Sequence, residues 1–156
     1  SKLKSEKILL ENSKDNLVIR TNVLYDYFDN TYASFLNWVV RSLKNENQIN
    51  IVEDQWNNPT WTSSLAVVIE KAIDEGLNGL VHWGDRDWIN RYDFANKIAS
   101  AFSLKTSLIK PILTSDLNQK ARRPLKSGLN SDFAQKNLNL EPPSIEECLD
   151  SIKKQM

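Results

Sequence analysis

The chain alternates between two spacings of apolar residues, and these spacings predict alternating strands and helices. Apolar runs of strand length lie at 16–21, 49–52 and 79–84, whereas the segments between them repeat apolar residues every three to four positions. The resulting order is helix, strand, helix, strand, helix, strand, helix, strand, helix, helix. The predicted helices cover 1–11, 32–43, 60–73, 90–102, 131–137 and 144–152, and the fourth strand covers 107–111. Such alternation predicts an α/β fold, with the run at 16–21 buried on both faces of a parallel sheet.

Residue types at the ends of these segments agree with this order. Asn90 with Asp93, and Ser144 with Glu147, have the spacing of a capping box at a helix start. Gly76 suits the left-handed position that follows a helix. The chain has no initiator Met and starts within its first predicted helix, so we expect further sequence to precede it.

Composition is that of an ordinary globular protein and argues against several function classes. The chain has 156 residues, 40% of them hydrophobic and 26% charged, which predicts one compact domain. Twenty Lys and Arg residues balance twenty Asp and Glu residues, so there is no basic excess for nucleic acid and no basic face for a membrane. No apolar run approaches the length of a transmembrane helix.

Cysteine and histidine are too few for two common kinds of site. Cys148 is the sole cysteine, so an internal disulfide is impossible, and with the single His82 it cannot form a Cys/His zinc cluster. We therefore expect no metal-binding residues in this chain and a reducing, cytoplasmic location, while the sequence leaves open whether a metal assists the reaction. Histidine suits acid–base chemistry near neutral pH, but a single histidine within a strand is more often structural.

The polar segment at 54–60 is the first candidate site. It follows the strand at 49–52, and in open α/β sheets ligands bind at the carboxyl ends of strands. Its side chains offer a carboxylate, amides and a hydroxyl beside a flat indole ring, a set that suits a sugar or a nucleoside. The main contributors are Asp54, Gln55, Trp56 and Thr60. The same residues also favour a turn followed by a helix N-cap, and the sequence leaves both interpretations open.

Arg122 and Arg123 form the only adjacent arginine pair in the chain. Arginine forks bind phosphate oxygens bidentately, and Pro124 favours an extended backbone that presents such forks. Two solvated surface arginines are the alternative, and the residues alone do not decide between them. A nucleotide ligand needs only one or two local arginines, so the overall charge balance does not argue against one.

Several motifs follow one another over nearly the whole chain. They are Arg20-Thr21-x-x-x-Tyr25, Asp54-Gln55-x-x-x-Pro59-Thr60, Gly79-Leu80-x-His82, Tyr92-Asp93-x-Ala95 and Ala121-Arg122-Arg123-Pro124-x-x-Ser127-x-Leu129-Asn130. In this order they resemble the carboxyl-terminal half of the dTDP-4-dehydrorhamnose reductase family, which belongs to the extended short-chain dehydrogenase/reductase superfamily. The resemblance implies an α/β fold that is the carboxyl-terminal part of a NAD(P)-binding, Rossmann-like fold, without its dinucleotide-binding half.

The resemblance implies a reductase that passes hydride from NADPH or NADH to the keto group of a nucleotide-linked 4-keto-deoxysugar. Ser1-Lys2-x-x-x-Glu6 resembles the end of the superfamily's Tyr-x-x-Ser-Lys-x-x-x-Glu helix. By that match Lys2 would be the catalytic lysine, which lowers the pKa of the tyrosine and contacts the nicotinamide ribose. The tyrosine itself would precede residue 1. Residues 1–27 would end the Rossmann-like part, and 28–156 would form the substrate-binding part.

The cofactor, NADP or NAD, would be bound mainly by a preceding half. The four glycines are scattered, so neither a dinucleotide fingerprint nor a P-loop can be built from them, and the chain alone is expected to be inactive. By matching position, the contacts to a nucleotide-diphosphate sugar would come from three strand-end segments that line one cleft, with Arg123 directed toward the diphosphate. Those residues are Asn22, Asp54, Gln55, Trp56, Pro59, Thr60 and Arg123.

The chain departs from that family in two places. Val23 stands where the family usually has tryptophan, and Trp56-Asn57-Asn58 replaces a glycine-containing loop. The sugar and the base therefore stay open. A second set of motifs, among them Arg91-Tyr92-Asp93, resembles the regulatory beta subunit of methionine adenosyltransferase. A noncatalytic, NADP-binding regulatory subunit is thus the alternative function, and a stand-alone carbohydrate-binding chain is a third. The sequence does not decide between a monomer and a homodimer.

Overall fold

The structure, a computed structural model, describes residues 1–28, 34–117, 119 and 121–155. Its α-helices are α1 (Lys2–Asn12), α2 (Phe35–Lys44), α3 (Thr62–Asp74), α4 (Arg91–Ala101), α5 (Asp132–Leu138) and α6 (Ile145–Gln155), with short 3-10 helices η1 (Thr106–Leu108) and η2 (Thr114–Asp116). Its strands are β1 (Leu17–Thr21), β2 (Leu24–Tyr25), β3 (Ile49–Val52), β4 (Trp56–Asn57), β5 (Thr60–Trp61), β6 (Gly79–Trp83), β7 (Ile89–Asn90) and β8 (Ile109–Ile112). The predicted order of helices and longer strands is confirmed.

The strands pair in twos rather than forming one wide sheet. Within the described residues, β1 pairs with β6, β2 with β5 and β3 with β8, all in parallel, and β4 pairs with β7 in antiparallel orientation. Parallel pairing between strands that are separated by helices confirms the α/β fold class. The short pairs β2–β5 and β4–β7 were not predicted, and they divide the polar segment 54–60 between two ladders.

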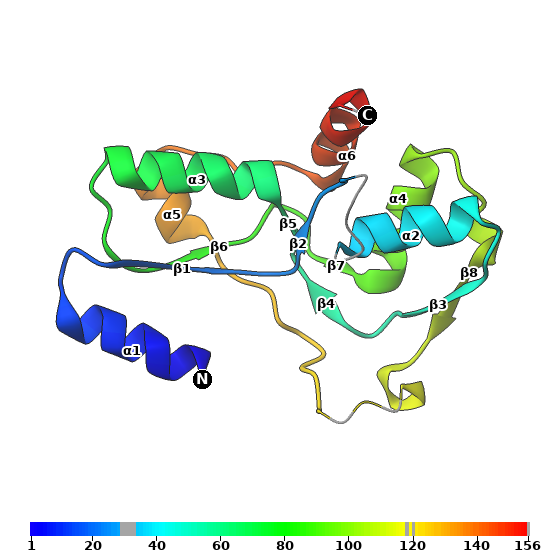
Figure 1. Cartoon of the computed structure of the whole chain (residues 1–156), viewed down its shortest axis with the longest axis horizontal. Helices are drawn as coiled ribbons and strands as arrows, with labels where there is room; N and C mark the ends of the chain where they lie inside the picture. Colours follow the sequence, from blue (N-terminus) through cyan, green and yellow to red (C-terminus); the bar gives the residue numbers. More distant parts are fainter. Residues whose placement is uncertain (29–33, 118, 120, 156) are drawn as a thin grey trace.

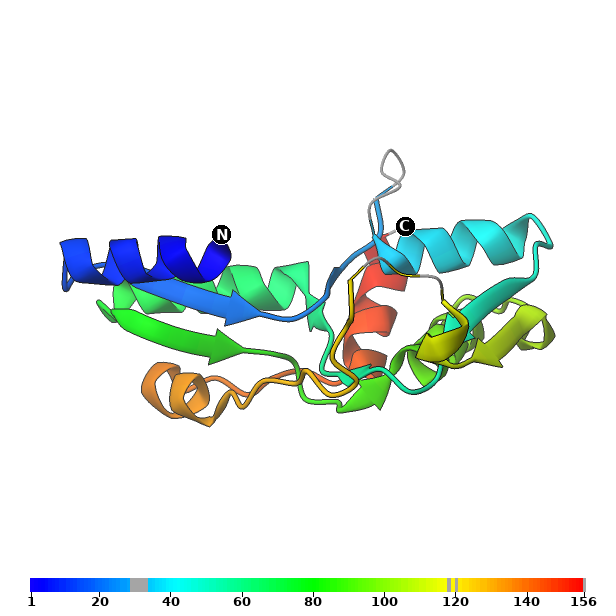
Figure 2. The same ribbon diagram turned by 90° about the horizontal axis from the view of Figure 1, so that it is seen from below.

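Two lobes lie side by side, one around β1 and β6 and the other around β3 and β8 (Figure 1). In the first lobe, α3 and α5 cover one face of the strand pair and α1 lies on the other (Figures 1 and 2). Each lobe has its own apolar core, which for the first lobe includes Val68, Val81 and Leu138. The core of the second lobe packs α2, α4 and α6 against β3 and β8. The chain therefore has two separate apolar cores, and the segments that run between the lobes connect them.

The first strand is less buried than predicted. We expected a run at 16–21 that is buried on both faces, but every residue of β1 is half-buried. Among the described residues β6 is its only strand partner, and α1, which covers its other face, has no buried residue of its own. A forked ion pair holds this helix in place, because Arg20 Nη2 lies 2.6 Å from Glu6 Oε2 and Arg20 Nε lies 3.1 Å from Glu6 Oε1.

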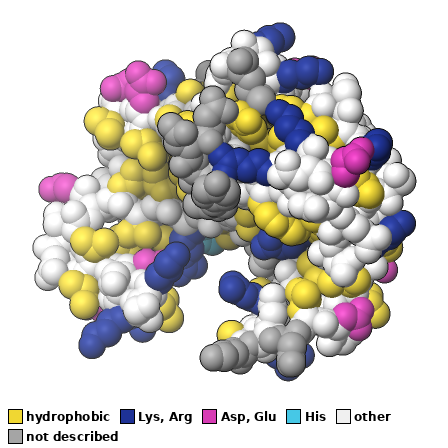
Figure 3. Space-filling view, turned by 45° about the vertical axis from the view of Figure 1, so that its right-hand side comes forward, with side chains coloured by type: hydrophobic (Ala, Val, Ile, Leu, Met, Phe, Trp, Pro, Cys, Tyr) yellow, Lys and Arg dark blue, Asp and Glu magenta, His cyan; other side chains and the backbone are white. Residues whose placement is uncertain are grey.

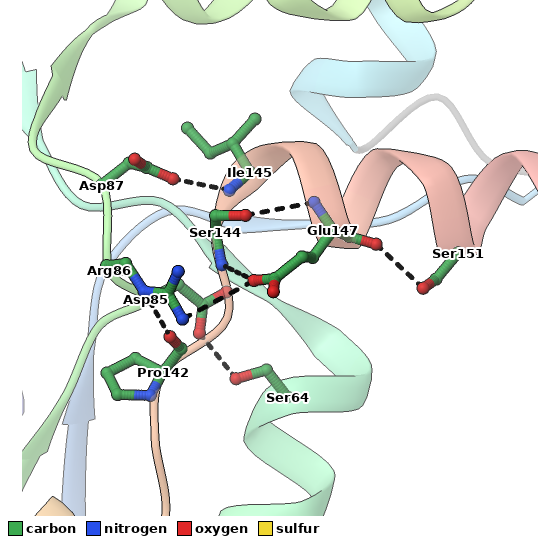
Figure 4. A network of polar contacts seen from close by, with 9 residues as sticks. All are labelled: Ser64, Asp85, Arg86, Asp87, Pro142, Ser144, Ile145, Glu147 and Ser151. Carbon is green, nitrogen blue, oxygen red and sulfur yellow. Dashed lines mark hydrogen bonds and ion pairs between the residues drawn. The ribbon is translucent and has the colours of Figure 1, made fainter.

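The turn after β6 fixes the starts of two helices (Figure 4). Asp85 is 1% exposed, and its carboxylate accepts hydrogen bonds from the Trp61 backbone N–H at 2.7 Å and from the Ser64 hydroxyl at 2.6 Å, at the start of α3. Two residues on, Asp87 accepts the Ile145 N–H, the first of α6, at 2.6 Å. Carboxylates stabilise helix starts because unpaired N–H groups gather there. One turn therefore orients α3 and α6 together.

The predicted helix caps are confirmed. Glu147 N–H donates to the Ser144 hydroxyl at 3.2 Å, and Ser144 N–H donates to Glu147 Oε2 at 2.6 Å, which completes the capping box of α6. At α4, Asp93 N–H donates to Asn90 Oδ1 at 2.7 Å. Gly76 follows α3 with a positive φ of 61°, as expected for the residue after a helix.

Burial makes Asp85 a source of pH-dependent stability. Desolvation raises the pKa of Asp85 to about 6, against 3.8 for an exposed aspartate, although its hydrogen bonds oppose the shift. Between about pH 4 and pH 6 the folded protein thus binds more protons than the unfolded chain, so stability falls as the pH rises through this window, by up to about 3 kcal/mol. Replacing Asp85 with Asn should remove this slope from the free energy of unfolding, measured by denaturant titration. Asp74→Asn, at an exposed position on α3, should keep it, and an equal slope in both variants would contradict the assignment.

Candidate functional site

A cavity of about 290 Å³ opens in the second lobe where α2, β3, the start of α4 and the segment after η2 meet. We call it the arginine pocket. Two arginines, three amide side chains and two aromatic rings line it, together with apolar residues. The lining residues are Phe35, Trp38, Asn50, Ile51, Val52, Gln55, Arg91, Leu117, Gln119 and Arg123. Gln55 and Arg123, two of the predicted site residues, thus lie in one cavity although 68 positions separate them in the sequence.

A relay of hydrogen bonds holds Gln55 in the wall of the arginine pocket. The Gln55 amide is buried and donates to the Thr114 hydroxyl at 3.0 Å, and that hydroxyl donates to Asp54 at 2.6 Å. The Thr114 backbone N–H also donates to Asp54, at 3.0 Å. These bonds from Thr114 hold the pKa of Asp54 below its usual value despite partial burial. Asp54 therefore orients Gln55 through η2 and does not itself line the pocket.

The charge and the rings of the arginine pocket suit a phosphorylated, ring-containing ligand. Arg91 and Arg123 provide positive charge, and the described residues that line the cavity include no Asp or Glu. Phe35 and Trp38 lie on α2 with their ring centres 5.8 Å apart. Arginine forks bind phosphate oxygens, and aromatic faces stack on planar rings. The pocket can thus hold an anion at one place and a ring at another.

Asn22 and Thr60 lie in hydrogen-bonded cross-links at the carboxyl end of β1. Asn22 donates to Asn58 Oδ1 at 2.7 Å, and the hydroxyls of Thr21 and Thr60 are 3.1 Å apart. Asn58 is buried, and it also bonds the Leu129 backbone at both N–H and C=O, at 2.9 and 3.0 Å. The first strand, the central segment and the chain after the arginine pair are therefore tied at one junction. Neither Asn22 nor Thr60 is among the lining residues of the arginine pocket.

Trp56 and Pro59 also lie outside the arginine pocket. The Trp56 ring stacks on Trp88 with ring centres 6.4 Å apart and an angle of 20° between their planes. Trp88 in turn covers Gly128, where a Cβ would come within 1.9 Å of the indole, so only glycine fits beneath it. Pro59 is buried and lines a small space beside Val23. A ligand role for these side chains stays a prediction.

Lys2 is exposed at the amino end of α1 and makes no hydrogen bond or ion pair that we observe with the described residues. This end of the helix points toward the middle of the molecule, on the side where the segment after η2 passes (Figure 1). In the space-filling view one face is hollowed between the lobes, and Lys and Arg side chains border the hollow on both sides (Figure 3). A ligand in this hollow would meet positive charge from both lobes.

Sequence reasoning missed Arg91 and Phe35 as pocket residues. Arg91 is the first residue of α4, where a charged side chain is common at a surface, and Phe35 belongs to an apolar helical stripe that predicts a core position. A larger cavity of about 600 Å³ lies beside Trp88 and α5 and contains none of the predicted site residues. In the described part of the chain, no cluster of three or more His, Cys, Asp or Glu could hold a metal ion, and no helix is long and apolar enough to span a membrane.

The comparison with known families gives a match over the whole chain. Residues 1–156 match the family model described as "RmlD substrate binding domain". The dTDP-4-dehydrorhamnose reductase of Aggregatibacter actinomycetemcomitans is 26% identical over 98% of this chain and 55% of its own length. The bovine methionine adenosyltransferase 2 subunit beta is 28% identical over 83% of this chain and 40% of its own length.

A solved structure agrees with the whole course of the chain. The crystal structure of dTDP-4-dehydrorhamnose reductase from Bacillus anthracis, in complex with NADP, superposes with a TM-score of 0.90 at 28% identity. The match covers 99% of this chain and 54% of that one. The chain thus spans about half the length of the reductases that it matches.

The relay from Asp54 to Gln55 makes a prediction about local order. Replacing Asp54 with Ala removes the acceptor of both Thr114 donors, so unfolding should become easier by roughly 1–3 kcal/mol. Hydrogen exchange of the amides at 113–116 should rise in the same variant. The neighbouring exposed carboxylate offers a control, since Glu53→Ala should leave both quantities nearly unchanged. Equal effects of the two substitutions would show that the relay does not order η2.

Proposed function

We propose, because this chain belongs to the RmlD substrate binding domain family, that it is the substrate-binding part of an NAD(P)H-dependent reductase of nucleotide-linked 4-keto-deoxysugars. The observation that carries the proposal is the arginine pocket, in which Gln55 and Arg123 meet beside the rings of α2. Family membership supports the reaction class, and the pocket offers features that suit a nucleotide-diphosphate group. The likeness to reductases over the whole chain supports both.

In this proposal Arg123 binds the diphosphate with its planar fork, and the nucleotide ring stacks on Phe35 or Trp38. Gln55 contributes an amide whose orientation is fixed by Thr114. The sugar then extends toward the carboxyl end of β1, where Asn22 is half-buried. The remaining predicted residues either contact the ligand at the edge of this path or support residues that line it. Asp54 is of the second kind, because its bonds to Thr114 orient Gln55.

Lys2 is proposed to assist proton transfer. An ammonium group near a phenol favours the phenolate and so lowers its pKa, which makes proton donation feasible near neutral pH. The residue fits this role because it is exposed and lies at the end of α1 that faces the middle of the molecule. The same ammonium can donate to a ribose hydroxyl, which is the contact to NADP or NAD expected from this chain. The bound nicotinamide would supply the hydride.

We keep the division of the chain at residue 27, with 1–27 as the end of the nucleotide-binding part and 28–156 as the substrate-binding part. The Glu6–Arg20 ion pair supports treating α1 and β1 as one unit. A noncatalytic NADP-binding regulatory subunit stays the second candidate, and the likeness to the bovine methionine adenosyltransferase 2 subunit beta favours it. The residue three positions before Ser1 in the complete protein decides between them. Tyrosine there supports a reductase, whereas phenylalanine would support the regulatory subunit.

Arg123 is expected to act on substrate binding. Replacing Arg123 with Ala in the complete protein should weaken binding of the nucleotide sugar by roughly 1.5–3 kcal/mol, the range for a hydrogen bond to a charged group. The rise should appear in the Michaelis constant and in calorimetric titration. Arg122→Ala is the matched control, because it removes the same charge from an exposed neighbour that does not line the arginine pocket. An unchanged Michaelis constant in Arg123→Ala would refute the assignment.

Lys2 is expected to act on turnover. Replacing Lys2 with Met keeps most of the unbranched side chain but removes its charge, so kcat should fall by roughly a hundredfold or more while substrate affinity changes little. Lys4→Met, at an exposed position on the same helix, should keep normal turnover. Full activity in Lys2→Met would show that the likeness to the catalytic helix is accidental.

A further inference from the structure

The segment that carries Arg123 is held in place by a few specific contacts rather than by burial. Residues 121–130 lead from the second lobe to α5 in the first (Figure 1). Only Ser127 and Leu129 among them are half-buried, and the others are exposed. Burial of apolar surface therefore contributes little to fixing this segment. The place of Arg123 in the wall of the arginine pocket depends on the points at which the segment is attached to the rest of the chain.

The first point of attachment is the backbone of Trp56. Its N–H donates to the Leu125 carbonyl at 2.7 Å, and the Ser127 N–H donates to its carbonyl at 2.9 Å. Lys126 and Trp56 thus form a parallel bridge. The strand that contains Trp56, β4, has only two residues and also pairs with the two residues of β7. Pairing over so few residues is marginally stable by itself, so the segment needs further support.

The second point of attachment is a glycine packed against an indole ring. A Cβ at Gly128 would come within 1.9 Å of Trp88, so the glycine lies against the ring and a larger residue would clash with it. The Trp56 ring stacks on the same indole, with ring centres 6.4 Å apart. Trp88 therefore contacts both the segment and the strand to which the segment is bridged. Aromatic contacts of this kind contribute beyond the area that they bury.

The backbone on both sides of Trp88 is itself fixed. Asp87, the residue before it, accepts the Ile145 N–H at the start of α6 at 2.6 Å. Ile89, the residue after it, begins β7 and pairs with Asn57 in β4. Trp88 lines the cavity of about 600 Å³ and is not among the residues that line the arginine pocket. It can therefore act on a ligand in the arginine pocket only through other residues.

We propose that Trp88 is a positioning residue for Arg123. By packing on Gly128 and on Trp56, its ring holds residues 121–130 in the arrangement that brings Arg123 into the wall of the arginine pocket. This inference rests on the proposed function, in which Arg123 contacts the ligand, and it adds the residues that set where this contact is made. Without the ring the segment would occupy several arrangements, and affinity would fall in proportion to the fraction that can bind.

The contact between ring and glycine can be disturbed from either side. In the complete protein, calorimetric titration with dTDP and UDP should show about tenfold weaker binding for Trp88→Ala and for Gly128→Ala, a factor that matches the worth of an aromatic contact. Hydrogen exchange of the Ser127 and Leu129 amides should rise in both variants without any ligand. Phe133→Ala is the matched control, because it removes an exposed ring from α5 that lines neither cavity, and it should change neither quantity.

Two double variants separate positioning from a general loss of stability. Gly128→Ala should cost no further affinity when Trp88 is already Ala, because the clash exists only with the ring. Gly128→Ala should also cost no further affinity in the Arg123→Ala background, since a residue that acts through Arg123 has no effect once that side chain is gone. A substitution that only loosened the fold would weaken binding in both backgrounds.

The outcomes distinguish this inference from the proposed function. If Trp88→Ala and Gly128→Ala bind dTDP and UDP as Phe133→Ala does, the positioning role is overturned while the proposed function stands. The same holds if Gly128→Ala keeps its full effect in the Arg123→Ala background. If Arg123→Ala itself binds as the unchanged protein does, the role of Arg123 in the proposed function fails, and this inference fails with it.

Discussion

The architecture depends on a buried polar junction centred on the Asn58 amide. This side chain accepts a hydrogen bond from Asn22 at the end of β1, donates to the Asp85 carbonyl after β6, and pairs with the Leu129 backbone. Gly84 leaves room for it, because a Cβ there would approach Asn58 Nδ2 to 2.2 Å. A buried amide that loses its partners is costly. The end of β1, the turn after β6 and the chain that follows Arg123 are therefore held in one arrangement around Asn58.

Much of the fold could be predicted because its long elements have clear apolar periods. The wide apolar stripe of α2 and the apolar runs of β3 and β6 are signals that follow directly from side-chain direction. The two-residue pairs β2–β5 and β4–β7 could not be predicted, since a ladder of that length has no period to detect. The partial burial of β1 was missed for a related reason. An apolar run shows that a strand can be buried, whereas the elements beside it decide how far it is buried.

The candidate site was predictable in part, and the limit is set by long-range hydrogen bonds. Gln55 and Arg123 were predicted as site residues from their chemistry and motif positions, and the fold places both in the lining of the arginine pocket. Sequence could not show that Asp54 and Asn22 bond to Thr114 and Asn58, because such partners are distant along the chain and leave no periodic pattern. Arg91 was missed because a charged residue in the first turn of a helix is common at any surface. Its place in the pocket depends on Arg123 and on the Phe35 ring, which only the folded chain brings close to it.

The pairing of the strands also determines when the pocket can exist during folding. Leu17 pairs with Gly79 and Ile49 with Ile109, so each main ladder closes a long loop before its contacts are gained. Topologies of this kind fold slowly compared with helical bundles, since the entropy of closure is lost early. The walls of the arginine pocket come from segments that these ladders bring together, so an early intermediate would lack it. Any ligand that occupies the arginine pocket would therefore bind only folded molecules, and by mass action it would raise the folded fraction.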